Sequence, residues 1–142
     1  MNIANLLIRS AKNFPDLPAL AHGTEITATY RQFSDQAAAL AGALLNEYAL
    51  KKGDRVALIM KNHPEYWVAL FALWQAGLVA VPVNAKLHIS EFDYILENSG
   101  AKLCFATSDL ASALRDLKSD AKIIDISDPE YNNLKNSAPI AV

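Results

Sequence analysis

The chain has 142 residues and a formal net charge of −2 at pH 7, and its length suits one domain. With 52% hydrophobic and 20% charged residues, its composition excludes intrinsic disorder and low-complexity chains. The single cysteine, Cys104, excludes an internal disulfide framework and a Cys-rich zinc site. The slightly acidic charge excludes a basic footprint for nucleic acid.

The first third of the chain predicts two helices separated by a hairpin. Apolar residues recur at helical spacing within residues 3–13. Residues 18–30 are rich in strand-forming side chains around the pair His22-Gly23, which predicts two short strands and a turn. Thr29 and Gln32 have the spacing of a capping box, which opens a second helix whose apolar positions follow one face.

Beyond residue 54 the pattern changes to four apolar runs of similar spacing. The runs are Val56–Met60, Leu78–Val83, Leu103–Ala106 and Ile123–Ile126. None alternates polar and apolar side chains, which is typical of strands buried on both faces of a parallel sheet. Helical segments separate the runs, and this order predicts right-handed βαβ crossovers. The predicted fold class is therefore α/β, with an N-terminal hairpin and helices joined to a mainly parallel sheet.

Capping residues predict where the three connecting helices begin and end. The first is expected to start after the cap Asn62 and to stop at Gly77. The second is expected to start after the cap Ser90 and to stop at Gly100. The third is expected to span about residues 108–118.

Two segments leave alternatives open. Residues 127–142 are polar and contain prolines, so they are predicted to be a linker or a loose end beyond a domain of residues 1–126. The apolar stretch 66–83 approaches the length of a membrane span. Because Gly77 and Pro82 interrupt it, we favour a buried helix, a turn and a buried strand over a membrane span, and an amphipathic membrane contact stays open as an alternative. Polar residues break the apolar N-terminus, so no secretory signal is expected and the cytoplasm is the expected compartment.

Motif spacing excludes the common phosphate-binding loops and zinc motifs. The nearest two glycines are 11 residues apart, so neither the G-x-G-x-x-G turn nor the Walker loop fits. His22, His63 and His88 lack a second metal-binding side chain at helical spacing. We interpret all three histidines as solvated loop residues.

Several other reactive or charged residues have simpler structural explanations. Cys104 lies inside an apolar strand and is interpreted as a small buried hydrophobe, not as a nucleophile. Asp54 and Arg55 precede a strand, where turn chemistry and a surface ion pair explain them. The Lys51-Lys52 pair is interpreted as part of a solvated loop.

Aromatic and amide residues provide the remaining candidates. Trp67, Phe71 and Trp74 recur on one helix face, which favours core packing over a ligand cage. Asn84 and Lys86 follow the second apolar strand, and ligands in open α/β sheets bind beyond the carboxyl ends of strands. They are the better binding candidates, although a role in loop structure is favoured for both.

Four segments occur in an order typical of one enzyme superfamily. They are Ala28–Phe33 (ATYRQF), Gly53–Ala57 (GDRVA), Leu73–Pro82 (LWQAGLVAVP) and Ile95–Lys102 (ILENSGAK). Together they resemble the adenylate-forming superfamily of acyl-CoA synthetases, peptide-synthetase adenylation domains and luciferases, whose second core motif has the form L-K-A-G-x-x-x-V-P. The resemblance covers about residues 3 to 107, and Val83–Leu87 is most similar to fatty-acid–CoA ligases.

The resemblance implies that residues 1–126 are the N-terminal α/β subdomain of an AMP-binding enzyme and that 127–142 link it to a remainder. Such a parent enzyme joins a carboxylic acid to CoA, using ATP and Mg²⁺, through an acyl-adenylate. The family's phosphate loop, adenine and Mg²⁺ motif and C-terminal lysine have no match here. No catalytic, cofactor-binding or metal residue therefore carries over, and the chain alone is expected to be inactive and to bind no cofactor.

The expected partners are the remainder of the parent enzyme and a second copy of the chain through an exposed apolar face. No nucleic acid partner and no transmembrane segment are expected. Two alternatives stay open: a non-catalytic partner-binding module or half of a split enzyme, and an unrelated small α/β binding protein of flavodoxin-like type. The flavodoxin-like alternative predicts ligand loops after the strands, and only Thr107-Ser108-Asp109 suits that role.

Overall fold

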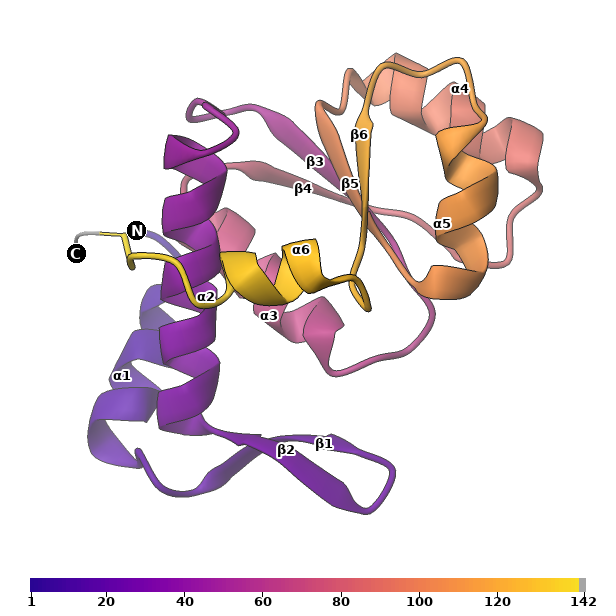
Figure 1. Ribbon diagram of the computed structural model, residues 1–142. Helices are drawn as coiled ribbons and strands as arrows, with labels where there is room; N and C mark the ends of the chain where they lie inside the picture. The colour runs from indigo at the N-terminus through magenta and orange to yellow at the C-terminus, as the bar shows by residue number, and fades with distance from the viewer. Residues whose placement is uncertain (141–142) are drawn as a thin grey trace.

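The computed structural model describes residues 1–140 as a parallel sheet between helices, with a separate hairpin near the N-terminus (Figure 1). The helices are α1 (Asn5–Asn13), α2 (Tyr30–Asn46), α3 (Glu65–Gln75), α4 (Ile89–Ser99), α5 (Ser108–Arg115) and α6 (Pro129–Leu134). The strands are β1 (Pro18–His22), β2 (Glu25–Thr29), β3 (Arg55–Ile59), β4 (Val79–Pro82), β5 (Leu103–Ala106) and β6 (Lys122–Asp125).

Strands β3 to β6 form one parallel sheet in the order β4-β3-β5-β6, while β1 and β2 pair as an antiparallel hairpin. In the sheet, Val56 of β3 lies opposite Leu103 of β5 and Ala80 of β4. Helices connect the consecutive strands, as parallel pairing requires. The predicted α/β class, with its hairpin and βαβ units, is confirmed.

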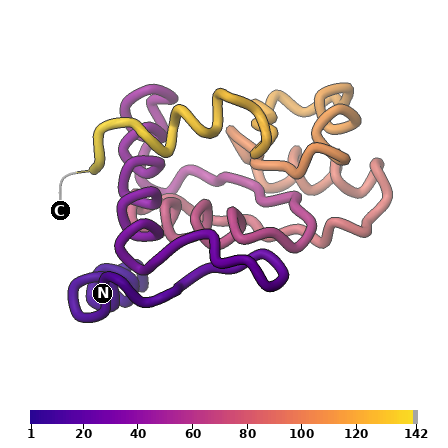
Figure 2. Tube along the Cα trace, turned by 60° about the horizontal axis from the view of Figure 1, so that its bottom comes forward, coloured from indigo at the N-terminus to yellow at the C-terminus, as the bar shows by residue number. Residues whose placement is uncertain are grey.

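The sheet separates two apolar cores because its side chains alternate between faces. Helices α2, α3 and α6 cover one face, while α4 and α5 cover the other (Figures 1 and 2). The first face buries Val56, Leu58 and Phe105; the second buries Ile59 and Cys104. The continuous apolar runs thus reflect strands covered on both sides.

Strand β4 departs from that expectation. We predicted a strand buried on both faces over residues 78–83, but Val79 is 45% exposed and Pro82 is also exposed. The difference arises because β4 is the edge of the sheet and pairs only with β3. Pro82 has no N–H to donate, and proline within a sheet is confined to such edges or to bulges.

Two predicted helix starts are wrong, while the capping box at Thr29 is confirmed by reciprocal hydrogen bonds with Gln32 of 2.9 and 3.3 Å. Asn62 does not cap α3, which begins at Glu65. The backbone N–H of Glu65 instead donates to Nδ1 of His63 at 3.1 Å. An imidazole nitrogen thus accepts the hydrogen bond that the sequence pattern assigned to an amide oxygen.

Helix α4 is also capped by a histidine and not by the predicted residue. Ser90 was predicted to cap this helix, but His88 does so. The N–H of Ser90 donates to Nδ1 of His88 at 3.2 Å, and the N–H of His88 donates to Glu91 at 2.8 Å. His88 is therefore the cap itself, and not only a solvated loop residue.

The C-terminal segment is not the loose end that its polar composition predicted. It forms α6, whose Tyr131 and Leu134 are buried against α2 and the sheet. Beyond the helix the segment crosses α2, and the N–H of Ile140 donates to the carbonyl of Ala38 at 3.0 Å (Figure 2). Two apolar residues three positions apart are enough to bury one side of so short a helix. The predicted division between residues 1–126 and a linker to a remainder stays a prediction.

The crossing over α2 depends on Gly42. A β-carbon at this position would overlap the backbone carbonyl oxygen of Ala138. We expect Gly42→Ala to push the segment off α2 and to lower the free energy of unfolding by about 1–3 kcal/mol through overpacking. Urea denaturation and hydrogen exchange at the Ile140 amide measure both effects. Helix propensity alone would raise stability by about 1 kcal/mol, so a net increase would contradict the close approach.

Candidate functional site

The strand order creates one crevice where a ligand site is expected. From β3 the chain crosses to β4 on one side and then returns past β3 to β5 on the other. Ligands in open α/β sheets bind beyond the carboxyl ends of the strands at such a reversal. The residues that follow β3 and β5 therefore define the candidate site.

Side chains after β3 and β5 are joined to one another across the crevice. The N–H of Lys61 donates to the hydroxyl of Thr107 at 3.2 Å, and its ammonium lies 2.7 Å from the carboxylate of Asp109. The Lys61 ammonium, by its hydrogen bond, lowers the pKa of Asp109. Ser108 donates to the buried carboxylate of Asp125 at 2.9 Å. Lys61 and Asp109 are thus paired with each other, and the Asp125 carboxylate is held by a hydrogen bond.

A hollow of about 470 Å³ lies between the carboxyl ends of β3 and β4. It brings together Lys61, Asn62, Asn84 and Lys86, and Tyr66 contributes an aromatic wall. The side chain of Asn84 accepts a hydrogen bond from the N–H of Lys86 at 2.9 Å. The favoured role of Asn84 in loop structure is confirmed, while the exposed Lys86 and Asn62 leave this hollow polar and cationic at its rim.

The same end of the sheet contains a polar cluster that the sequence did not suggest. Glu65, the first residue of α3, accepts hydrogen bonds at 2.7 Å from both the Tyr131 hydroxyl and the Lys135 ammonium. Tyr131 is almost fully buried. Burial is the main cause that holds the pKa of Tyr131 well above its ordinary value, and the nearby Glu65 carboxylate adds to the effect. This cluster ties α6 to α3.

Because the pKa of Tyr131 is raised on folding, alkaline pH should destabilise the protein. Below pH 10 the Tyr131 phenol is neutral in both the folded and the unfolded protein. Above pH 10 the phenol ionises in the unfolded protein but stays neutral in the folded one, so the free energy of unfolding falls as the pH rises further. Burial also raises the pKa of Cys104 to about 12, which acts in the same direction. Urea midpoints between pH 8 and 11 should therefore fall, and Tyr131→Phe should flatten the decline. An equally steep decline in that variant would contradict the assignment.

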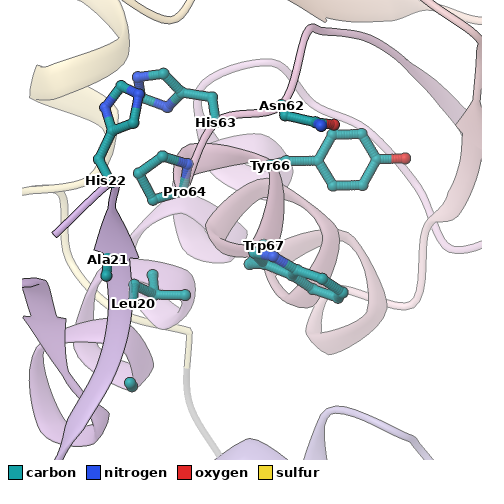
Figure 3. Close-up of a pocket in the computed structure, with 10 residues that line it drawn as sticks. Leu20, Ala21, His22, Asn62, His63, Pro64, Tyr66 and Trp67 are labelled. Atoms are coloured by element: carbon teal, nitrogen blue, oxygen red, sulfur yellow. The ribbon is translucent and has the colours of Figure 1, made fainter.

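A hollow of about 500 Å³ lies between the hairpin and the start of α3 (Figure 3). The rings of His22 and His63 meet there edge to face, with centroids 5.0 Å apart. Partial burial is the main cause that lowers the pKa of His63, and the neighbouring His22 lowers it further. Figure 3 shows Leu20 of β1 and Trp67 of α3 flanking the hollow. His63 is thus partly buried and holds the start of α3, whereas His22 is exposed as predicted.

Asp54 and Arg55 lie at the opposite, amino end of the sheet. Asp54 accepts the N–H of Lys51 at 2.8 Å and pairs with Lys102 at 3.0 Å, and these hydrogen bonds lower its pKa. Arg55 donates to the carbonyl of Ser99 at 2.7 Å. The prediction of turn chemistry and an ion pair is confirmed, and these residues are far from the crevice.

The aromatic face of α3 divides into a buried and an exposed part. Phe71 packs edge to face on Phe33 and on Trp74, with centroid distances of 5.4 and 5.1 Å. Core packing is therefore confirmed for Phe71 and Trp74. It is wrong for Trp67, which is 50% exposed. Cys104 is fully buried, as predicted for a small hydrophobe.

The residues at the crevice do not fit a complete ATP–Mg²⁺ site. Lys61 is paired with Asp109, and Asp125 is held by Ser108. Within residues 1–140 no three His, Cys, Asp or Glu side chains cluster closely enough to hold a metal ion. The chemical capacity of this edge is limited to hydrogen bonding and two exposed ammonium groups, those of Lys61, which pairs with Asp109, and Lys86. We assign no catalytic or metal residue to the chain.

The apolar stretch 66–83 folds as helix α3, a turn and strand β4. Along residues 1–140, every helix is too short or too polar to cross a bilayer.

The fold is that of an N-terminal subdomain of an adenylate-forming enzyme. The N-terminal domain of FACL13 from Mycobacterium tuberculosis superimposes with a TM-score of 0.86 and 29% identity, over 99% of this chain and 37% of that one. Residues 7–141 match the family described as AMP-binding enzyme, so this chain belongs to that family.

Two curated relatives indicate the chemistry found among similar sequences. A long-chain-fatty-acid–CoA ligase of Haemophilus influenzae is 36% identical over 113 residues, which are 80% of this chain and 20% of the relative. A feruloyl-CoA synthase of an Amycolatopsis species is 38% identical over 107 residues, 75% of this chain and 21% of the relative. The chain thus spans about one fifth of the length of these relatives.

Proposed function

We propose that this chain forms part of the scaffold of an ATP-dependent acid–thiol ligase. In the first step a carboxylate oxygen attacks the α-phosphorus of ATP, forming acyl-adenylate and releasing pyrophosphate. In the second step the CoA thiolate attacks the acyl carbonyl, the thioester forms, and AMP leaves. The match of residues 7–141 to the AMP-binding family carries this proposal.

The acid that we propose is a fatty acid. The support is the identity with a long-chain-fatty-acid–CoA ligase over 113 residues, together with the Val83–Leu87 sequence at the end of β4. Feruloyl-CoA synthase, a comparably similar relative, makes an aromatic acid the alternative. CoA and ATP are the proposed co-substrates of the whole ligase, and Mg²⁺ is its proposed cofactor.

The chain by itself is proposed to be inactive and to bind none of these co-substrates. The crevice supports this view because its charged side chains, Lys61 and Asp109, are paired with each other. No glycine-rich turn follows β3, β4 or β5 in the sequence. Its partners are then the remainder of the ligase and, in isolation, a second copy. A reducing cytoplasm is the proposed compartment, which suits the single unpaired Cys104.

The test is acid-dependent ATP–pyrophosphate exchange by the full product of the gene that encodes this chain, beside the 142-residue chain alone. We expect exchange with a long-chain fatty acid by the full product and none by the chain. Preference for ferulate would reject the fatty-acid assignment. Exchange or Mg²⁺-dependent ATP binding by the chain alone would reject its inactivity. A full product without any exchange would favour the alternative of a non-catalytic partner-binding module.

A further inference from the structure

Two helices of this protein have a histidine ring as the hydrogen-bond acceptor at their start. At α3 the backbone N–H of Glu65 donates to Nδ1 of His63 at 3.1 Å, and at α4 the N–H of Ser90 donates to Nδ1 of His88 at 3.2 Å. A backbone N–H can only donate, so Nδ1 of each ring carries a free lone pair and the proton of the neutral ring is on Nε2. We call His63 and His88 the histidine acceptors.

One proton on each ring removes these hydrogen bonds. The lone pair that accepts the backbone N–H is also the one that takes up the proton, because both nitrogens of an imidazolium ion are donors. The new positive charge then lies at a helix N-terminus, where the helix dipole favours anions. Both effects destabilise the first turn of the helix. Histidine is the side chain that ordinarily changes its charge between pH 5 and 8.

The histidine acceptors lie beside the same hollow. The hollow of about 470 Å³ beyond β3 and β4, which we call the polar hollow, is lined by Asn62 and Tyr66 at the start of α3 and by Lys86 before α4. His63 follows Asn62 directly, and Tyr66 belongs to the first turn of α3 (Figure 3). His88 follows Lys86 by two residues. The residues that line the polar hollow are therefore anchored at two helix starts whose acceptors can be protonated.

The charged groups around His63 come from three elements. His22 of β1 meets its ring edge to face, while Glu65 of α3 and Lys135 of α6 act on it through their charges. Partial burial is the main cause that lowers the pKa of His63, His22 and Lys135 lower it further, and Glu65 opposes them. The unfolded protein therefore takes up this proton first. The stability that neutral His63 contributes is complete above the ordinary histidine pKa of about 6.5 and is lost as the pH falls toward the lowered value.

The surroundings of His88 are simpler. Its side chain is exposed, the charged group in contact with it is Glu91 of the same helix, and Lys86 is the nearest cation in the sequence. Glu91 accepts the backbone N–H of His88 at 2.8 Å. That hydrogen bond does not involve the ring, so protonation breaks only the half of the capping box that depends on Nδ1.

We infer that the polar hollow has an acid-sensitive border, because protonation of His63 and His88 breaks the hydrogen bonds at the starts of α3 and α4, frays their first turns and loosens the residues that line the hollow. The later turns stay in place, since Leu73 of α3 and Leu96 of α4 are buried in the two cores. This response belongs to the residues of this chain and holds whichever acid the proposed ligase takes.

NMR of the imidazole nitrogens of the 142-residue chain tests the tautomers directly. At pH 7.5, above the ordinary histidine pKa, Nδ1 of both histidine acceptors should give the signal of an unprotonated nitrogen and Nε2 that of an N–H group. A proton on Nδ1 of either ring at this pH would overturn the inference.

Amide hydrogen exchange at pH 7.5 and 5.0 measures the consequence, because carboxylates titrate mainly below this range. The protection factors of the Glu65 and Ser90 amides should fall roughly tenfold on acidification, the size expected for loss of a helix cap. The Gln32 amide is the internal reference, since it donates to the hydroxyl of Thr29, which does not titrate. Unchanged protection at Glu65 and Ser90, or an equal fall at Gln32, would overturn the inference.

Variants assign the acid response to the two rings. His63→Asn and His88→Asn supply an acceptor that does not titrate, and asparagine is a preferred capping residue. Each variant should keep the protection of its own helix start at acidic pH and leave the fall at the other start unchanged. A fall that persists at Glu65 in His63→Asn and at Ser90 in His88→Asn would overturn the inference.

His22→Gln is the matched control for His63. This variant should keep the fall in protection at Glu65 but move its midpoint to higher pH, because His22 lowers the pKa of His63. Loss of the fall in this variant would assign the acid response to His22 and contradict the role of the Nδ1 acceptor.

Discussion

Replacing Phe105 by alanine should lower the free energy of unfolding by about 3–5 kcal/mol, the usual cost of emptying a buried aromatic site. Phe105 is fully buried in β5, an interior strand with β3 on one side and β6 on the other. Its ring meets that of Tyr131 edge to face, with centroids 5.6 Å apart. The substitution therefore leaves a cavity in the core beside the sheet. It also weakens the packing of α6, whose buried residues are Tyr131 and Leu134.

Urea denaturation followed by circular dichroism measures this loss. The matched control is Tyr94→Ala, because Tyr94 is exposed on α4 and should change stability by no more than about 0.5 kcal/mol. A loss of unfolding free energy below about 1.5 kcal/mol for Phe105→Ala would show that α6 does not pack on β5. A cavity enclosed between α6 and the sheet costs more than that.

Replacing Lys135 by methionine should cost roughly 2–4 kcal/mol, because it leaves a carboxylate in a mostly buried site without its cation. The side chains of Lys135 and Glu65 are only 13% and 18% exposed, and their charged atoms are 2.7 Å apart. The hydrogen bond from Tyr131 to Glu65 survives the change, which keeps the cost below that of a fully unpaired charge. Methionine retains the apolar stem, so packing is largely preserved.

A double-mutant cycle checks the origin of this cost. Glu65→Gln removes the charge that Lys135 neutralises, so adding it to Lys135→Met should recover part of the lost stability. The coupling energy between the two sites should be about 1–3 kcal/mol. Strictly additive losses would mean that Lys135 stabilises α6 through its contact with the Tyr131 ring and not through the ion pair.

The sheet could be predicted from the sequence because each strand is a local pattern. Four apolar runs without alternation specify parallel strands, and Leu103–Ala106 was located to the residue. The capping box of Thr29 and Gln32 is equally local. Burial of β4 was not predictable in this way, because strand order, which places β4 at an edge, depends on contacts between segments far apart in the chain.

The helix caps and the tail show where residue preferences mislead. Histidine is not among the preferred capping residues, yet His88 accepts the hydrogen bond that holds the start of α4. The tail was judged from its polar composition, while its burial depends on Tyr131 and Leu134 alone. A helix of six residues offers too few turns for a periodic signal.

The position of Asn84 and Lys86 could be predicted from the sequence, whereas the ion pairs near them could not. Asn84 and Lys86 were expected beyond a strand end, and they do line the hollow there. The pairing of Lys61 with Asp109 and the cluster of Glu65 with Lys135 join residues 48 and 70 positions apart. No local pattern specifies such contacts, because they follow from the crossover connections that bring the strand ends together.

Pro82 has a consequence for how the protein resists aggregation. An exposed strand at the margin of a sheet offers free N–H and C=O groups on which another chain can form cross-β structure. At β4, four residues long, Pro82 removes one of those donors; at the other margin β6 carries the exposed Lys122. Proline and lysine are the residues that natural sheets place at such margins to block this templating. The two edge strands of this sheet are thus protected against growth into fibrils.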